Sequence, residues 1–134
     1  MTLPSGFLDS GEVFLKPDGK DLKAEEIEKL FPPLGFYSFL LDGSAVKGKQ
    51  ELLAALAAGF KFPAYFGYNW DALLDCLRSL PDLLPASGYA VVIERSGLFL
   101  KDSPADLADF RDIAETAAAF LLEKHKLPFK IVML

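Results

Sequence analysis

The sequence has almost none of the residues that build disulfides, metal centres or thiol chemistry. Its 134 residues include one cysteine, Cys76, and one histidine, His125. A single cysteine excludes an intrachain disulfide, and one cysteine with one histidine cannot supply the usual ligand set of a zinc site. A glycine-rich loop of the kind that cradles phosphates is also missing. We therefore expect neither a metal nor a cofactor.

Long apolar runs and an excess of basic residues are missing as well. No apolar run approaches the ~18 residues that would suggest a membrane span, and the first residues lack the basic and apolar regions of a signal peptide. We expect a cytoplasmic protein without a membrane partner. Lys and Arg number 14 against 19 Asp and Glu, a net charge of −5. A negative net charge disfavours nucleic acid as a partner and favours a basic protein. An equally good explanation is that the negative charge only keeps the protein soluble.

The chain does contain enough apolar residues for one core. The hydrophobic fraction is 51% over 134 residues, which suits a single domain. Apolar patterns and turn residues predict strands over 36–41, 89–94 and 129–133, and helices over 49–58, 70–80 and 104–125, with Ser103 as a capping residue before Pro104. Three strands that alternate with helices predict an α/β fold with a small three-stranded parallel sheet.

The first 35 residues have a different pattern. They predict a short strand within 12–16, a turn at 17–19 and a short helix over 24–30 that Asp21 caps. This segment is too small to bury a core of its own. We therefore expect an N-terminal extension, residues 1–35, attached to a domain that spans residues 36–134.

The predicted helix over 70–80 has a charged ridge. Asp71, Asp75 and Arg78 fall within about 60° on a helical wheel, opposite an apolar face, and Asn69 is a suitable N-cap. Two carboxylates near a helix N-terminus should both stay ionised, which favours a fixed charge over a proton shuttle. The alternative is that they are ordinary solvated acids, paired with Arg78.

Aromatic residues are concentrated just before this helix. Six of the 17 aromatic residues lie within residues 60–70: Phe60, Phe62, Tyr65, Phe66, Tyr68 and Trp70. Protein interfaces are enriched in Tyr and Trp beside desolvated charges. We expect Tyr65 or Tyr68 to face outward as part of a binding surface, while most of the phenylalanines pack against the base of the helix.

The stretch Pro63-x-Tyr65-Phe66-Gly67-x-Asn69-x-Asp71-Ala72-Leu73-x-Asp75-Cys76-Leu77 resembles the binding loop and helix of the barstar family of ribonuclease inhibitors. The resemblance extends over roughly residues 36–134. It implies a three-layer barstar-like fold and an intracellular inhibitor of a basic, secreted microbial ribonuclease, whose active site the helix enters as a mimic of RNA phosphates. It assigns Tyr65 to the aromatic contact, Asp71 to an acidic contact and Asp75 to the central acid.

The resemblance also has departures. Arg78 stands where a small neutral contact residue is expected, so it either pairs with Asp75 or meets an acid on a different partner. Leu74 replaces a tryptophan. The acidic residue expected on the last helix matches Glu123, and Leu122 is an equal match at that register.

These residues are compatible with three functions. The first is a non-enzymatic inhibitor, monomeric when free, that contacts its nuclease through Tyr65, Tyr68, Asn69, Asp71, Asp75, Arg78 and Glu123. The second is a binding module that has the same fold and a different basic partner, such as an immunity protein against another toxin nuclease. The third, a hydrolase that uses Asp71 and Asp75, is disfavoured because the sequence offers no nucleophile–base pair; His125 lies far from Cys76 in the sequence.

Overall fold

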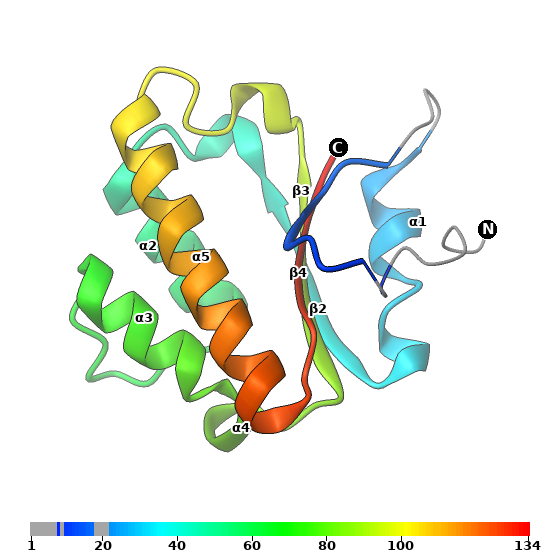
Figure 1. Cartoon of the computed structure of the whole chain (residues 1–134). Coiled ribbons are helices and arrows are strands. Elements are labelled where there is room, and N and C mark those ends of the chain that lie inside the picture. The colour runs from blue at the N-terminus through cyan, green and yellow to red at the C-terminus, as the bar shows by residue number, and fades with distance from the viewer. Residues whose placement is uncertain (1–7, 9, 18–21) are drawn as a thin grey trace.

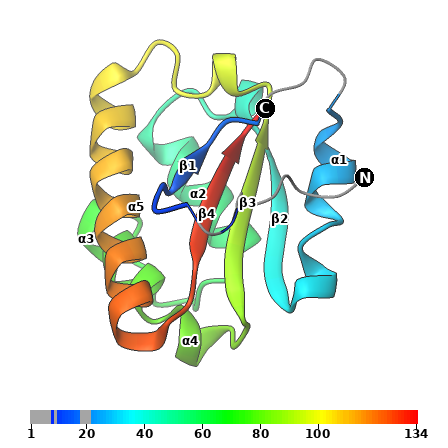
Figure 2. The same cartoon turned by 45° about the vertical axis from the view of Figure 1, so that its right-hand side comes forward.

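A parallel β-sheet lies at the centre of the computed structural model, which describes residues 8, 10–17 and 22–134 (Figure 1). Its strands are β1 (Phe14–Leu15), β2 (Phe36–Asp42), β3 (Gly88–Glu94) and β4 (Phe129–Met133). They are ordered β1-β4-β3-β2, as Figure 2 shows, and every pair is parallel. In the register, Val91 of β3 lies opposite Phe39 of β2 and Ile131 of β4.

The prediction of three strands was wrong, because the sheet has four. The added strand is β1, which confirms the short strand predicted within residues 12–16. It pairs with the outer edge of β4, where the Ile131 amide donates to the Val13 carbonyl at 2.8 Å. Lys130 reinforces this junction, because its buried ammonium donates to the carbonyls of Ser10 and Glu12, each at 2.7 Å. The N-terminal segment thereby covers backbone groups that β4 would otherwise leave unpaired.

Helices cover both faces of the sheet, which makes three layers (Figures 1 and 2). The helices are α1 (Ala24–Glu28), α2 (Lys49–Gly59), α3 (Trp70–Arg78), α4 (Leu80–Leu83) and α5 (Pro104–His125), with short 3-10 turns η1 (Pro32–Leu34), η2 (Gly43–Ala45) and η3 (Ser96–Leu98). One face carries α1, and the other carries α2, α3, α4 and α5. None of the described helices is long and apolar enough to cross a membrane.

The central strand β3 divides the core in two, because its side chains alternate between the faces. Tyr89, Val91 and Ile93 point to the larger cluster, which α2, α3 and α5 cover. Ala90 and Val92 point to the smaller cluster, where α1 and the following turn contribute Ala24, Ile27 and Phe31. The described part of the first 35 residues thus packs directly on the sheet. The division at residue 35 stays a prediction.

Two helix boundaries differ from those expected. The helix predicted over 70–80 is broken at Ser79, and Pro81 lies in the first turn of α4, where its missing N–H costs nothing. Ser103 precedes α5 but does not cap it, because its hydroxyl donates to the Lys47 carbonyl at 2.7 Å. The N-cap residue of α1 is Lys23, and the proposed cap Asp21 and the turn residues 18 and 19 lie outside the described residues.

Candidate partner-binding surface on α3

The start of α3 is set by Asn69. Its side-chain Oδ1 accepts a hydrogen bond from the Ala72 amide at 2.8 Å, and its Nδ2 donates to the Gly67 carbonyl at 3.3 Å. The first bond satisfies a helical N–H that has no partner within the helix, and the second links the helix to the aromatic loop. Asn69 is exposed, but its side chain already has a structural role as a cap.

The inner face of α3 is apolar and packs against α5 within the larger core cluster. Leu73, Cys76 and Leu77 are buried there. Burial raises the pKa of the Cys76 thiol, and the nearby charge of Asp75 raises it further. A protonated, buried thiol is a poor nucleophile. Cys76 therefore acts as a packing residue in this helix.

The outer face of α3 carries the two aspartates. Asp71 and Asp75 are one turn apart and both are exposed. Neither carboxylate makes a hydrogen bond or an ion pair with any of the described residues. The apolar inner face holds the helix in place, so the two negative charges have a fixed spacing and remain accessible from outside.

Arg78, at the end of α3, does not pair with Asp75, the first of the two alternatives given above; contact with an acid on a partner stays a prediction. Its guanidinium lies over the ring of Phe120 on α5, 5.6 Å from the centroid. The Arg78 Nε is buried and has no hydrogen-bond partner among the described residues. At the other end of α3, the ammonium of Lys49 lies 5.3 Å from the centroid of Trp70. The aspartates therefore lie on a helix with a cation stacked on an aromatic ring near each end.

The loop before α3 separates its aromatic rings into buried and exposed sets. Phe60 and Phe66 are buried, and the rings of Phe60, Phe62, Phe66 and Tyr68 follow one another with centroid distances of 5.8, 5.0 and 4.7 Å. Tyr65 is 75% exposed and Tyr68 is 49% exposed. The phenylalanines anchor the loop, and both tyrosines are presented to solvent beside the helix.

The loop also contains backbone strain at Tyr68. Its φ of 50° lies in the left-handed region, which residues other than glycine rarely adopt. The preceding turn is closed by the Phe66 amide, which donates to the Pro63 carbonyl at 3.0 Å. Such strain persists only where the surroundings determine the conformation. The ring contact between Phe66 and Tyr68 supplies that constraint, so the exposed tyrosine has a defined position.

Glu123 lies on α5 and is exposed. It is three residues from Phe120, so the two side chains are about 60° apart on the helix, and Phe120 contacts Arg78 of α3. Leu122, the other residue matched at this register, is about 160° from Phe120. It lines a hollow of about 1020 Å³ between α5 and the N-terminal segment. Between these two residues, Glu123 is the one on the side of α5 that faces α3.

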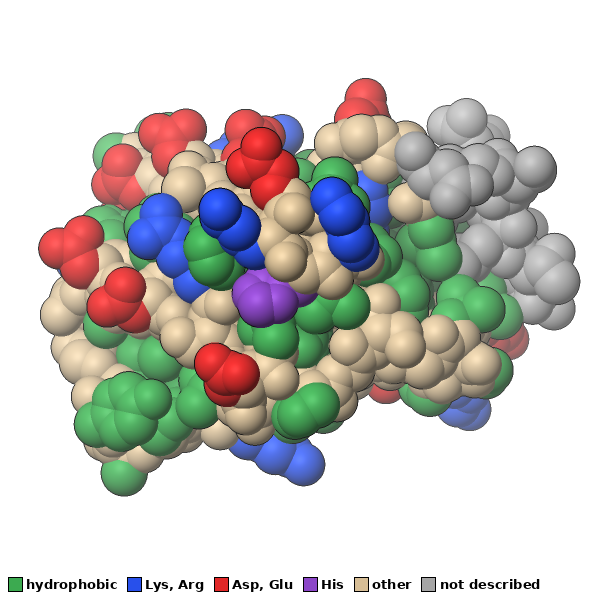
Figure 3. All heavy atoms as spheres, turned by 60° about the horizontal axis from the view of Figure 1, so that its bottom comes forward, with side chains coloured by type: hydrophobic (Ala, Val, Ile, Leu, Met, Phe, Trp, Pro, Cys, Tyr) green, Lys and Arg blue, Asp and Glu red, His purple; other side chains and the backbone are tan. Residues whose placement is uncertain are grey.

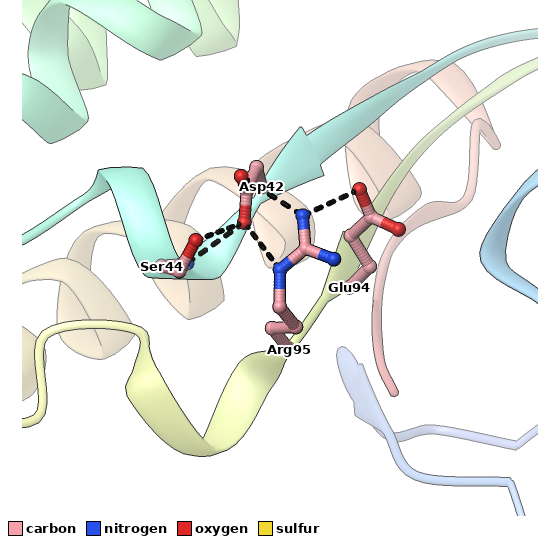
Figure 4. Close-up of polar contacts among 4 residues, drawn as sticks. All are labelled: Asp42, Ser44, Glu94 and Arg95. Atoms are coloured by element: carbon pink, nitrogen blue, oxygen red, sulfur yellow. Dashed lines mark hydrogen bonds and ion pairs between the residues drawn. The ribbon is translucent and has the colours of Figure 1, made fainter.

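Sequence reasoning missed a polar cluster at the carboxyl ends of β2 and β3 (Figure 4). Arg95 points between two acids, with its Nη2 2.9 Å from Asp42 Oδ2 and 3.2 Å from Glu94 Oε1. The amide and hydroxyl of Ser44 donate to Asp42 Oδ1 at 2.9 and 2.7 Å. The hydrogen bond from Arg95, followed by that from the Ser44 side chain, holds the pKa of Asp42 well below its usual range.

This cluster also constrains the backbone that follows the two strands. Arg95 adopts a left-handed backbone with φ 51°, and its carbonyl would lie 2.5 Å from a Cβ at Gly43. Asp42 and Arg95 are 53 residues apart in the sequence, so no local pattern reveals that they pair. Among the described residues, no group of three or more His, Cys, Asp or Glu side chains is arranged to hold a metal ion.

Comparison with known proteins identifies the family. The family model described as Barstar (barnase inhibitor) matches residues 36–133, well over half of the chain. This chain belongs to the barstar family. The match confirms the resemblance stated above, begins at the first residue of β2 and ends at the last residue of β4. A search of curated proteins found no match.

The barstar match contains the whole candidate surface. The aromatic loop, α3 and Glu123 all fall within it, whereas β1, α1 and η1 precede it. Barstar-family proteins are inhibitors that bind ribonucleases. The roles of Tyr65, Tyr68, Asn69, Asp71, Asp75, Arg78 and Glu123 in binding a partner remain predictions.

Proposed function

We propose that this protein inhibits a basic extracellular microbial ribonuclease by inserting α3 and the aromatic loop into its active site. Asp71 and Asp75 take the places of RNA phosphates, with Asp75 at the centre of the contact, and Tyr65 packs on the rim of the cleft. The protein performs no catalysis and needs no metal or cofactor. It acts in the cytoplasm, as a monomer until it meets the nuclease, and has neither nucleic acid nor membrane as a partner.

One observation carries the proposal. The carboxylates of Asp71 and Asp75 are exposed and unpaired among the described residues, although the helix that bears them is held by a buried face and a capped start. A nuclease cleft presents Arg and Lys to the phosphates of its substrate. Charge-assisted hydrogen bonds from such groups to a carboxylate are about twice as strong as neutral ones. Anions that are already in position lose little entropy when these bonds form.

The charge of the whole chain supports the same partner. A net charge of −5 attracts a basic nuclease over long range and accelerates association. Salt screens this attraction beyond a Debye length of about 8 Å at physiological ionic strength. We therefore expect the association rate to fall as salt is raised, while dissociation changes less.

A second function is favoured by Arg78. A cleft that is cationic throughout repels a cation on the charged ridge. The same surface therefore also suits an immunity protein for another toxin nuclease, or a regulator of a different basic protein. The barstar fold and the exposed acids are common to both functions. They differ only in the identity of the partner.

Inhibition of RNA cleavage tests the proposal. Barnase, the nuclease named in the family description, is mixed with the protein and with its Asp75→Ala variant, and cleavage of a labelled RNA is followed. We expect inhibition by the wild type that the variant loses. The matched control is Glu26→Ala, which removes the same charge from exposed α1 on the other face of the sheet. Unimpeded cleavage by barnase and by a panel of other basic ribonucleases would leave only the second function.

A further inference from the structure

The contact surface proposed above is not uniformly acidic. Figure 3 views the molecule from the end where α3 meets α4 and α5 ends, and basic side chains lie among acidic ones on this face. Arg78 is the basic residue that belongs to α3 itself. It lies one turn from Asp75, on the same ridge as Asp71. A partner that covers both aspartates must therefore also meet Arg78.

Three features of Arg78 indicate that its charge is available to a group on a partner. It pairs with neither Asp71 nor Asp75, although spacing along the helix brings Asp75 within reach. Its guanidinium is held over the ring of Phe120. Its Nε is buried without a hydrogen-bond acceptor among the described residues. The Nε is therefore closed to a partner, but the guanidinium pairs with no acid among the described residues, and its Nη groups keep donors for a carboxylate supplied from outside.

We propose that Arg78 is the residue that selects among nucleases, and that the true target carries a carboxylate beside the cationic cleft that receives Asp75. This inference rests on the proposed function. A cleft with only Arg and Lys at that position repels Arg78, since like charges opposed across an interface are strongly unfavourable. Planar, bidentate pairing makes arginine well suited to read a carboxylate. Phe120 contributes by holding the guanidinium in one place before binding.

Affinity for barnase measures the repulsive part of this proposal. Wild type and Arg78→Gln, which loses the charge and keeps a polar, unbranched side chain, are titrated against catalytically inactive barnase in low salt. We expect Arg78→Gln to bind about tenfold more tightly, because it removes one like-charge repulsion at short range. Arg78→Lys keeps the charge and should bind like the wild type. Arg111→Gln, a change of an exposed cation that lies over Phe14 on the other flank of α5, should leave affinity unchanged.

Selection of barnase variants tests whether Arg78 attracts a carboxylate on its partner. A displayed library of inactive barnase, randomised at residues around its cleft, is selected for binding to the wild type and, separately, to Arg78→Gln. We expect Asp and Glu to be enriched with the wild type and not with the variant. Equal enrichment in both selections, or Arg78→Gln binding barnase no more tightly than the wild type, overturns the inference.

The failures of the two proposals can be told apart. If Asp75→Ala abolishes binding and Arg78→Gln changes nothing, the inhibitory surface stands and the role of Arg78 is overturned. If neither the wild type nor Arg78→Gln binds barnase, inhibition of a barnase-type nuclease fails together with the selectivity that depends on it. Binding by Arg78→Gln alone supports both, because the neutral variant then recovers an affinity that the cation had suppressed.

Discussion

The α3 surface and the Arg95 cluster use aspartate in opposite ways. Asp42 receives hydrogen bonds from Arg95 and Ser44 inside the molecule, whereas Asp71 and Asp75 receive none from the described residues. The first carboxylate is part of the fold, where it ties the ends of β2 and β3 together. The carboxylates of Asp71 and Asp75 are held in position by the helix, but they make no bond to the described residues that stabilises the fold. The difference distinguishes an acid that stabilises the protein from acids available to a partner.

The largest effect should come from the ring that anchors the aromatic loop. Phe66→Ala removes a buried side chain that packs on Phe62 and should lower the free energy of unfolding by about 3 kcal/mol. Tyr65→Ala removes an exposed ring and should change it by less than about 0.5 kcal/mol while weakening the binding of a partner. Urea unfolding of both variants gives the comparison. If both variants lost the same unfolding free energy, the buried ring of Phe66 would not be what anchors the loop.

Asp75→Ala should have the next largest effect, and on binding alone. Loss of a central interface acid costs at least about 2 kcal/mol, a figure to which the barstar–barnase pair itself contributes as an example; this is about 30-fold in Kd. The unfolding free energy should stay the same, because the carboxylate has no partner within the described residues. Isothermal titration with barnase and thermal unfolding measure the two quantities. An unchanged Kd would remove Asp75 from the centre of the contact.

Asn69 tests whether one residue can both stabilise the fold and contact a partner. Asn69→Ala removes the N-cap of α3 and should lower the free energy of unfolding by about 1 kcal/mol. Asn69→Asp keeps an oxygen that can accept from the Ala72 amide and should restore most of the stability. If Asn69 also contacts the partner, Asn69→Asp should still bind barnase differently from the wild type. Identical affinities for wild type and Asn69→Asp would limit Asn69 to the cap.

Asp42 should show the smallest effect, and only above acidic pH. Its pKa in the folded protein lies below that of the unfolded chain, chiefly because Arg95 and Ser44 bond to the carboxylate. A group of this kind stabilises the fold at pH values above its unfolded pKa of about 4 and loses that contribution as the pH falls further. Asp42→Asn should therefore lower Tm at pH 7, and its difference from the wild type should shrink at pH 3. A difference that is the same at both values would contradict an electrostatic role.

Local patterns predicted much of the described fold. Continuous apolar runs marked β2, β3 and β4, and apolar residues at helical spacing marked α2 and α3, because the periods of strands and helices follow from backbone geometry. The addition of β1 to the sheet was not predicted, since a strand of two residues has no detectable period and its partner lies near the other end of the chain. The same separation in sequence hid the pairing of Asp42 with Arg95.

The candidate surface shows where sequence reasoning reaches its limit. The wheel placed Asp71, Asp75 and Arg78 on one side of a helix, and the helix does expose both aspartates. Pairing between Asp75 and Arg78 could not be decided from spacing alone. It depends on Phe120, a residue of α5 that competes for the guanidinium and holds it. The family match covers this surface as a whole, and it assigns no role to a single residue.

By itself, the amino-acid sequence determined most strand and helix types, the charged ridge and the aromatic loop, because each depends on neighbours within a few turns of chain. The residue pattern over 36–133 determined membership in the barstar family. Tertiary structure alone decided which polar groups are already bonded. Asp42 and Lys130 find partners across the sheet, Arg78 finds a ring on another helix, and Asp71 and Asp75 find none among the described residues. Hydrogen bonds and ion pairs act over a few ångströms, so only the folded arrangement can bring distant residues within that range.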